Sequence, residues 1–490
     1  MKQILNFLPS AIVALVICSS CNKQLEPKIE DQFSEESFAR TEADIKSALT
    51  PFYASFTSDW GGIDPGTGVF NFSFGVNYLG YDWMTRIMTD QDLDYWYQPW
   101  STYTWGPSSQ LSNDGTSFYN RIRFIARATD LIDKISKAKI TDDLKAKYSA
   151  EAKGLRAWYM FILYDIYGPL NVKLDPQHLS DTAISPRLSH DEYVAAMEND
   201  LTTAINGLPD RYNTDAQNWG RLSKGVARMI LFKLYMQEKQ WDKAKQIGSD
   251  IMGMGYSLMG NYKDVFIQPA NNELIYAVPG NTGMVQYWYD MIMPYDAVSV
   301  LGVNIQAGWL GDGMAWSFYD KYSSGDKRLE TIASEYVNSS GTVTDRSNGL
   351  AAAIPMKYVN YTPNHLGFEY VIYRYADVLL GMAEIENEIN GPTTTAVDYA
   401  KAVTDRAQTT IPSSAIASQA AFRDFILDER GRELYYEFGI RRQDLIRHGK
   451  LIPDAKARGI NTANDNMVLL PIPQDVINEG KGIITQNPGY

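Results

Sequence analysis

Cysteine is almost absent from this chain of 490 residues, and its only two cysteines, Cys18 and Cys21, both follow a hydrophobic N-terminal stretch. Beyond Cys21 the chain has no thiol with which to form a disulfide or to ligate a metal. Long apolar runs are also missing after this stretch, and no later segment approaches the ~20 residues that a membrane-spanning helix needs. These absences predict one globular body without disulfides or membrane helices.

Positive charge is the next shortage. Lysine and arginine number 45, against 58 aspartates and glutamates, which gives a formal net charge of -13. A phosphate backbone demands clustered Lys and Arg, so this balance argues against nucleic acid and against polyanionic substrates. A neutral ligand fits the composition better.

Motifs for catalysis and metal binding are missing as well. None of the four histidines has HExxH spacing, and the chain contains no GxSxG elbow, Walker-type loop or GxGxxG. The segment from Asp90 to Asp94 begins like a calcium loop, but Tyr95 and Ser101 stand where an EF-hand needs glycine and a bidentate glutamate. We expect no cofactor and no metal, and ordinary surface or buried roles for His178, His190, His365 and His448.

Residues 1–20 have the proportions of a bacterial secretory signal, with a basic residue followed by an apolar stretch too short to remain in a membrane. Small Ser20 precedes Cys21, as a lipoprotein signal peptidase requires, whereas bulky Ile17 precedes Cys18. We therefore predict that Cys21 is the lipidated first residue of the mature protein. The alternative is an ordinary secreted protein that is cleaved nearby.

Most of the remaining sequence has helical periodicity. From Tyr148, apolar residues recur at three- and four-residue spacings until Gly168 and the proline after it end the pattern. A second segment, at 221–255, predicts two helices that are divided near Lys239 and spaced as in a tetratricopeptide-like hairpin. A further pair begins at Tyr373 and resumes after Gly391. Repeated paired helices indicate a solenoid-like scaffold.

Tryptophan is unevenly distributed. Five of the eleven fall within 46 residues, among tyrosines, glycines and prolines that indicate loops. A second stretch, which also lacks helical periodicity, carries three more tryptophans, Trp288, Trp309 and Trp316. Long loops in compact proteins are usually functional or disordered, so we predict a helical frame with two aromatic loop regions, at 57–120 and 280–322.

A charged run at 428–445, DERGRELYYEFGIRRQDL, holds the densest group of carboxylates. Its carboxylates, Glu429, Glu433, Glu437 and Asp444, could in principle serve as an acid/base pair. The three- and four-residue spacings favour a different interpretation, in which the run is a helix laced with ion pairs.

Several motifs, in order along the chain, resemble the SusD/RagB family of surface lipoproteins, which serve nutrient uptake in Bacteroidetes. AEAKGLRAWYMFILYDIYGPLNV resembles the family's signature helix, with Arg156 and Tyr164 at matching positions. ILDERGRELYYEFGIRRQDLIRHGKL and the closing residues Gln486 to Tyr490 match the C-terminal signatures. The similarity runs nearly end to end.

The resemblance implies a mainly α-helical fold on four tetratricopeptide-like units, with a ligand site formed by irregular loops. It implies a single domain over 21–490, built from an N-terminal arm and first helix (21–55), the two aromatic loop regions, helical units at 141–279 and 370–450, and a C-terminal tail (465–490). Family members are noncatalytic lids on SusC-like TonB-dependent transporters of the outer membrane and capture glycans at the cell surface.

A glycan ligand gives the aromatic residues a role. Sugar rings present an apolar C–H face that stacks on indole and phenol rings, while their hydroxyls seek polar groups. We predict stacking platforms at Trp96, Trp100, Trp288, Trp309 and Trp316, support from Tyr95, Tyr97 and Tyr289, and hydroxyl acceptors at Asp92, Asp94 and Asp312. At least two of the tryptophans should be exposed in one concavity. The alternative for any one of them is that it pins its loop to the frame.

Two other functions remain open from the sequence. A peptide-binding lid of the RagB type would favour a deep cleft with polar groups facing a peptide backbone. An α-helical glycoside hydrolase would need two carboxylates roughly 5 to 10 Å apart inside the aromatic cleft.

Overall fold

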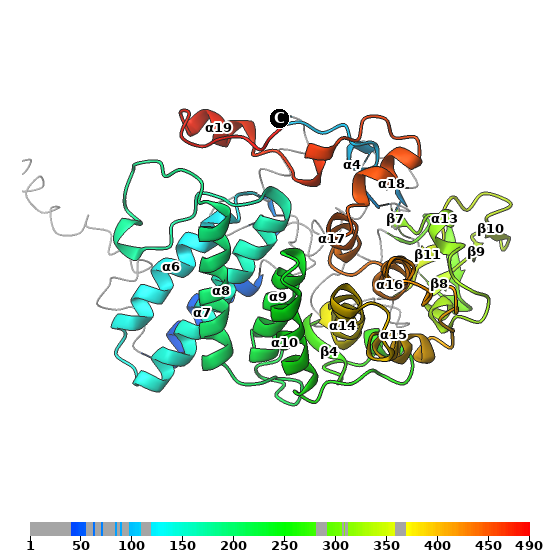
Figure 1. Cartoon of the computed structure of the whole chain (residues 1–490), viewed down its shortest axis with the longest axis horizontal. Helices are drawn as coiled ribbons and strands as arrows, with labels where there is room; N and C mark the ends of the chain where they lie inside the picture. The colour runs from blue at the N-terminus through cyan, green and yellow to red at the C-terminus, as the bar shows by residue number, and fades with distance from the viewer. Residues whose placement is uncertain are drawn as a thin grey trace, which may run out of the picture.

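The computed structural model describes residues 41–54, 62–63, 70–71, 84–85, 89–90, 98–108, 119–280, 292–305, 308, 312–357 and 369–490. In Figure 1 the body is elongated: helices stand side by side along it, short strands gather at one end, and the C-terminal segment crosses the top. The predicted leader and Cys21 lie outside the described residues.

The frame is a row of helices in which most pack against the next along the chain, whereas α16 packs chiefly against α14. The predicted mainly α-helical fold and the paired helices are confirmed, including the division near Lys239 and the end at Gly391; the tetratricopeptide-like description stays a prediction. The helices are α6 (Ile122–Lys137), α7 (Asp142–Tyr167), α8 (His190–Gly207), α9 (Lys224–Gln237), α10 (Trp241–Met252), α14 (Tyr375–Asn390), α15 (Thr394–Arg406), α16 (Gln419–Leu434) and α17 (Ile440–Arg447).

Further helical segments lie outside this row. They are α2 (Glu42–Ala54), α4 (Gln98–Thr102), α11 (Asp264–Ile267), α13 (Trp316–Tyr319), α18 (Leu451–Ala457), α19 (Gln474–Glu479) and the 3₁₀ turns η2 (Pro176–His178), η3 (Lys327–Thr331) and η4 (Asp465–Val468).

The signature helix, α7, lies between α6 and α8. It begins where the Thr141 hydroxyl accepts a hydrogen bond from the Leu144 amide at 3.4 Å, and it ends at Gly168, whose φ of 73° suits glycine. Gly154 lets α8 approach closely, because a β-carbon there would lie 2.9 Å from that of Ala204. The helix is therefore buried along most of its length.

One strand pair connects the two halves of the frame. β4 (Leu274–Val278) and β12 (Tyr370–Arg374) pair antiparallel, and all their residues are buried. Trp158 of α7 meets the ring of Tyr276 edge-on, with centroids 4.9 Å apart, and the ring of Tyr373 at 5.7 Å. The pair thus joins segments nearly one hundred residues apart to the central helix.

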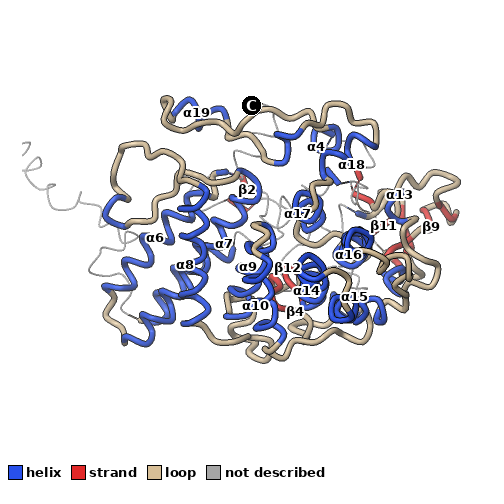
Figure 2. The backbone as a smooth tube through the Cα atoms, viewed as in Figure 1, coloured by secondary structure: helices blue, strands red, loops and turns tan. Residues whose placement is uncertain are grey.

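The other strands are short and lie mostly at the end of the body opposite α6, as Figure 2 shows. The second aromatic region, predicted as loop, contains β5, β6 and β7 as well as α13. A four-stranded sheet has the order β10-β9-β5-β6, and β11 pairs with β8. The strands are β1 (Gly62–Ile63), β2 (Phe70–Asn71), β3 (Thr89–Asp90), β5 (Ala297–Val300), β6 (Val303–Asn304), β7 (Asp312–Gly313), β8 (Ile332–Ala333), β9 (Glu335–Asn338), β10 (Val343–Asp345) and β11 (Ile354–Pro355).

The charged run at 428–445 does carry ion pairs, but the prediction of one helix through it is wrong. α16 ends at Leu434, and the chain turns before α17, where Tyr436 and Phe438 have positive φ. Glu437 therefore lies between the helices. Its carboxylate accepts from Arg374 at 2.7 Å, and both side chains are buried.

The C-terminal motif ties the end of the chain to α7. The side-chain amide nitrogen of Asn487 donates to the backbone carbonyls of Tyr167 at 3.0 Å and Leu470 at 2.7 Å. The Tyr490 hydroxyl accepts from the Trp105 indole at 3.0 Å. These bonds explain why the segment crosses the top of the body in Figure 1.

Candidate ligand-binding site

Two strands of two residues each bring the predicted aromatic loop regions together. β3, from the first region, pairs antiparallel with β7, from the second: Thr89 lies opposite Gly313, and Asp90 lies opposite Asp312. The two regions are separated in the sequence by most of the helical frame. The β3–β7 pair therefore gives them one common anchor.

The register of this pair determines where the segments that carry the predicted ligand residues join the two strands. The chain leaves β3 after Asp90 toward Trp96, and it reaches Asp312 of β7 from the side of Trp309. In an antiparallel pair these two ends lie directly opposite each other. The side chain of Asp312 lies outside the described part, as do Asp92, Asp94, Tyr95, Trp96, Tyr97, Trp288, Tyr289 and Trp309.

Trp316 begins α13, just after β7, and its side chain is partly exposed. Its indole nitrogen donates to the carbonyl of Leu350 at 3.1 Å, and the ring of Tyr319 meets it edge-on at 5.3 Å. The guanidinium of Arg346 lies 5.1 Å from the centre of the indole. The tryptophan is thus held in a fixed orientation while part of its surface stays accessible.

Arg346 and Asp320 are polar neighbours of Trp316 that the sequence did not indicate. Arg346 donates to both carboxylate oxygens of Asp320, at 2.9 and 3.1 Å, and both side chains are more than half exposed. A guanidinium and a carboxylate beside an indole offer hydrogen bonds of both directions to a hydroxylated ligand. No motif or spacing connects Arg346 to the aromatic stretch, because it reaches Trp316 only through the turn after β10.

Trp100 is not available as a stacking platform, contrary to the prediction. It lies in α4 and is only 6% exposed. Its ring packs against Trp105 at 5.5 Å, and the Tyr103 ring lies 5.0 Å from that of Trp105 on the same segment. Through the bond from Trp105 to Tyr490, this cluster fastens the first aromatic region to the C-terminal tail. Trp100 fits the alternative role of pinning its loop.

A small cavity of about 280 Å³ is lined in part by residues that flank β3 and β7 in the sequence. Thr85 precedes β3 and Phe318 lies in α13, so both aromatic regions contribute to its wall, together with α17 and α18. Lys321 donates to Asp428 at 2.7 Å. Burial alone would raise the pKa of Asp428, but Lys321 and Arg441 hold it below its usual value. Lys321, Arg441, Asp454 and Arg458 on its wall make the cavity polar and charged.

The carboxylates of the charged run lie in the frame and are ion-paired. Glu433 is fully buried and accepts from Arg374 at 2.6 Å. Burial would raise the pKa of Glu433, but the guanidiniums of Arg406 and Arg374 hold it well below its usual value. A general acid needs the opposite shift, toward neutral pH. This cluster gives no support to the hydrolase alternative.

The described residues lack both a metal-binding cluster and a membrane-spanning helix. They contain no group of three or more His, Cys, Asp or Glu side chains arranged to hold a metal ion. None of the helices within those ranges is both long and apolar enough to cross a membrane.

Two family models match different parts of the chain. A model of the SusD family matches residues 356–490. A model described as "Starch-binding associating with outer membrane" matches residues 34–236. SusD-like protein P25 of Formosa agariphila is 25% identical, over 93% of each chain. SusD-like protein P38 of the same organism is 25% identical, over 90% of each chain.

Solved structures of SusD-like proteins share the fold of this chain along almost its whole length. A laminarin binding SusD-like protein superimposes with a TM-score of 0.73 at 21% identity, covering 92% of this chain and 100% of the other. Surface glycan-binding protein A from Bacteroides thetaiotaomicron, solved with laminarihexaose, gives 0.71 at 23% identity, covering 91% and 99%. The two matching models, the curated relatives and the shared fold show that this chain is similar to SusD-like proteins along almost its whole length and has their fold.

Proposed function

We propose that this protein is a surface glycan-binding lipoprotein of the outer membrane, which captures an oligosaccharide or polysaccharide without cleaving it and delivers it to a SusC-like TonB-dependent transporter. The observation that carries the proposal is the β3–β7 pair, which gives two distant aromatic regions one anchor beside Trp316. Two relatives of the same fold support it, since one is named for laminarin binding and the other holds laminarihexaose.

Trp316 is the best supported platform for a sugar ring. Its hydrogen bond to Leu350 and its contact with Tyr319 fix the indole before a ligand arrives, which reduces the entropy lost on binding. Arg346, whose guanidinium lies over the indole ring, and its partner Asp320 supply groups that can bond to hydroxyls. We propose that the site also includes Trp96, Trp288 and Trp309, with Tyr95, Tyr97, Tyr289, Asp92, Asp94 and Asp312.

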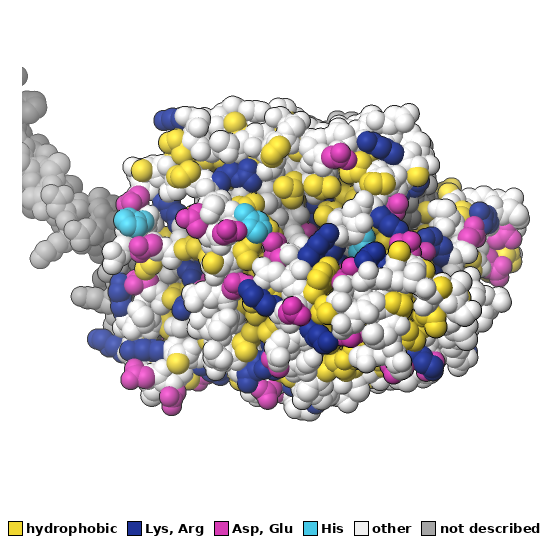
Figure 3. Space-filling view, in the orientation of Figure 1, with side chains coloured by type: hydrophobic (Ala, Val, Ile, Leu, Met, Phe, Trp, Pro, Cys, Tyr) yellow, Lys and Arg dark blue, Asp and Glu magenta, His cyan; other side chains and the backbone are white. Residues whose placement is uncertain are grey.

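The charge of the surface favours a neutral ligand. On the face drawn in Figure 3, basic and acidic side chains are interspersed and form no separate basic patch. With a net charge of -13, long-range attraction of a polyanion is absent. An uncharged glycan held by ring stacking and hydroxyl contacts meets no such penalty.

Lipidation of Cys21 would complete the proposed arrangement. Each buried acyl methylene contributes about 0.8 kcal/mol to membrane binding, so several acyl carbons hold the body at the bilayer. A tethered body beside its transporter sees that partner at high effective concentration. Glycan that dissociates is therefore recaptured close to the transporter.

Affinity electrophoresis against a panel of polysaccharides tests the glycan proposal. We expect one of them, laminarin among the candidates, to retard the mature protein, and Trp316→Ala to abolish most of the retardation. Trp241→Ala is the matched control, because Trp241 is also a partly exposed tryptophan at the first position of a helix, on the distant α10. Equal retardation of both variants would remove Trp316 from the site.

Incubation with the retarding polysaccharide tests whether the protein is noncatalytic. We expect the chain length of the polysaccharide to be unchanged after prolonged incubation, as measured by size-exclusion chromatography. Shortened products that persist in repeatedly purified protein would favour the hydrolase alternative.

A further inference from the structure

A larger cavity lies far from the β3–β7 pair, at the end of the body that carries α6 and α19 (Figure 1). Its volume is about 510 Å³, which lies within the usual range for small-molecule sites. Three parts of the chain form its wall: the start of α6, residues 171–185, and residues 476–484. Apart from Tyr119 and Asn120, which end the first aromatic region, the lining residues lie outside the aromatic regions, and none of them is among the residues proposed for the glycan site.

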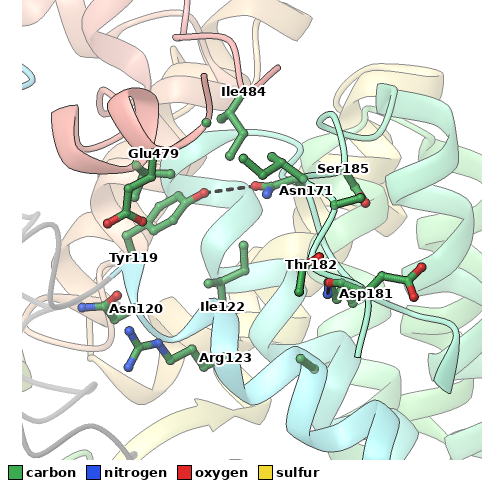
Figure 4. A pocket seen from close by; sticks show the side chains of 16 residues that line it. Tyr119, Asn120, Ile122, Arg123, Asn171, Asp181, Thr182, Ser185, Glu479 and Ile484 are labelled. Atoms are coloured by element: carbon green, nitrogen blue, oxygen red, sulfur yellow. Dashed lines mark hydrogen bonds between the residues drawn. The ribbon is translucent and has the colours of Figure 1, made fainter. Parts of the chain in front are cut away.

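Several polar side chains on this wall have no partner of their own. Arg123, Thr182 and Ser185 make no side-chain hydrogen bond or ion pair within the described residues, and the same holds for Asn120 and Glu479. In Figure 4, Arg123 and Glu479 lie on one side of the cavity, and Thr182 and Ser185 lie on the other. Both sides therefore present unused donors and acceptors to the cavity.

Tyr119 fixes one further group. Its hydroxyl donates to the amide oxygen of Asn171 at 3.2 Å, the bond drawn in Figure 4. Burial raises the pKa of Tyr119 to about 12, so the phenol keeps its proton at neutral pH. The amide nitrogen of Asn171 is thereby left as the group free to donate to a ligand.

The charges on the wall balance. Arg123 and Lys173 are its cations, and Asp181 and Glu479 are its anions. Lys173 donates to the carbonyl of Leu179 at 3.1 Å and the Asp181 carboxylate meets His178 at 2.9 Å, contacts that position both side chains and leave their charges in place. A ligand with net charge would therefore face an opposing charge as well as an attracting one.

Apolar side chains fill the spaces between these polar groups, among them Ile122, Ile184, Val476 and Ile484. A wall of aliphatic patches with dispersed donors and acceptors matches a molecule that has apolar C–H faces and hydroxyls around its edge. We propose that this cavity is a second binding site, which takes a neutral sugar of one or two rings. The inference stands independently of the proposed function, because it uses none of the residues of the β3–β7 site.

Isothermal titration calorimetry of the mature protein with D-glucose, D-galactose, D-xylose and maltose, each alone, tests this site. We expect one of these sugars to bind to the wild type and equally to Trp316→Ala, whose change lies at the other site. Ala183→Trp should abolish binding, because Ala183 is an exposed residue of the wall where an indole would fill the cavity without disturbing the core. Circular dichroism checks that the variant is folded.

A matched pair of arginines on α6 sharpens the test. Arg123→Ala removes a cavity guanidinium and should weaken sugar binding by about tenfold. Arg127→Ala, one turn further along and outside the cavity, should leave it unchanged. The proposal is overturned if no sugar of the panel binds, if binding survives in Ala183→Trp, or if diglycine binds in place of the sugars.

Discussion

The helical frame and the aromatic regions are held together in opposite ways. In the frame, Arg374 is fully buried and donates to Glu273, Glu433 and Glu437 at 2.6–2.7 Å. Beside Trp316 in the second aromatic region, the corresponding polar contact joins Arg346 to Asp320, and both side chains are more than half exposed. A buried ion network depends on every partner, whereas exposed groups can change at little cost. Substitutions among these exposed groups should therefore cost less stability than substitutions in the frame.

Acidification should have the largest effect on this contrast. Asp444 and Glu433 are buried carboxylates, and burial alone would raise their pKa values. Neighbouring arginines instead lower the pKa of Asp444 to about 2 and that of Glu433 well below its usual value. The unfolded chain therefore binds more protons below about pH 4.5, so this stabilisation is present above that pH and is lost as the pH falls toward about 2. We expect the urea midpoint to fall steeply over this range. A flat profile would mean that the network does not hold the frame.

Arg374→Met should have the next largest effect. It leaves three buried carboxylates without this cation, at a cost of about 3–5 kcal/mol in the free energy of unfolding. Urea unfolding followed by circular dichroism measures this change. The control is Arg423→Met, because Arg423 pairs with Glu388 at the margin of the frame, with 33% and 16% of the side chains exposed. Its cost should stay below about 1 kcal/mol, and equal costs would erase the contrast.

Trp100→Ala separates packing from ligand binding within the first aromatic region. Loss of this buried indole should lower the free energy of unfolding by about 3 kcal/mol, because a cavity is left beside Trp105. Trp316→Ala should do the reverse, with a smaller loss of stability and a larger loss of glycan affinity. Unfolding and binding measured on the same preparations distinguish the two roles. A Trp100→Ala variant of full stability that no longer binds glycan would restore Trp100 as a platform.

Arg346→Ala should have the smallest effect on stability, below about 1 kcal/mol, since its ion pair with Asp320 is exposed. Glycan affinity should fall by about fivefold to tenfold, because one hydrogen-bonding group beside Trp316 is lost. Lys401→Ala, which breaks an exposed pair with Asp405 on α15, is the control and should leave affinity unchanged. Isothermal titration calorimetry reads out both variants.

The frame could be predicted from the sequence where local signals decide the structure. Gly168 and Gly391 end helices because both adopt positive φ, and the break near Lys239 separates α9 from α10. The turn between α16 and α17 could not be predicted, because the charge periodicity continues through it. Its positive φ values fall on Tyr436 and Phe438, residues that rarely adopt them.

The candidate site was predictable in its composition but not in its assembly. Clustered tryptophans and tyrosines indicated the two regions, whereas the pairing of Asp90 with Asp312 involves strands too short to leave a pattern. Burial also separates residues that look alike in the sequence, since Trp100 is enclosed and Trp316 is partly exposed. The contact of Arg346 with Trp316 depends on tertiary structure alone.

The most direct test of the central claim is calorimetric titration of one glycan into the wild type, Trp96→Ala, Trp316→Ala and the double variant. If the two aromatic regions form one site, both single changes weaken binding of the same glycan, and the wild type binds one chain per protein. Unchanged affinity in Trp96→Ala beside a loss in Trp316→Ala, or two independent binding events in the wild type, would contradict the account.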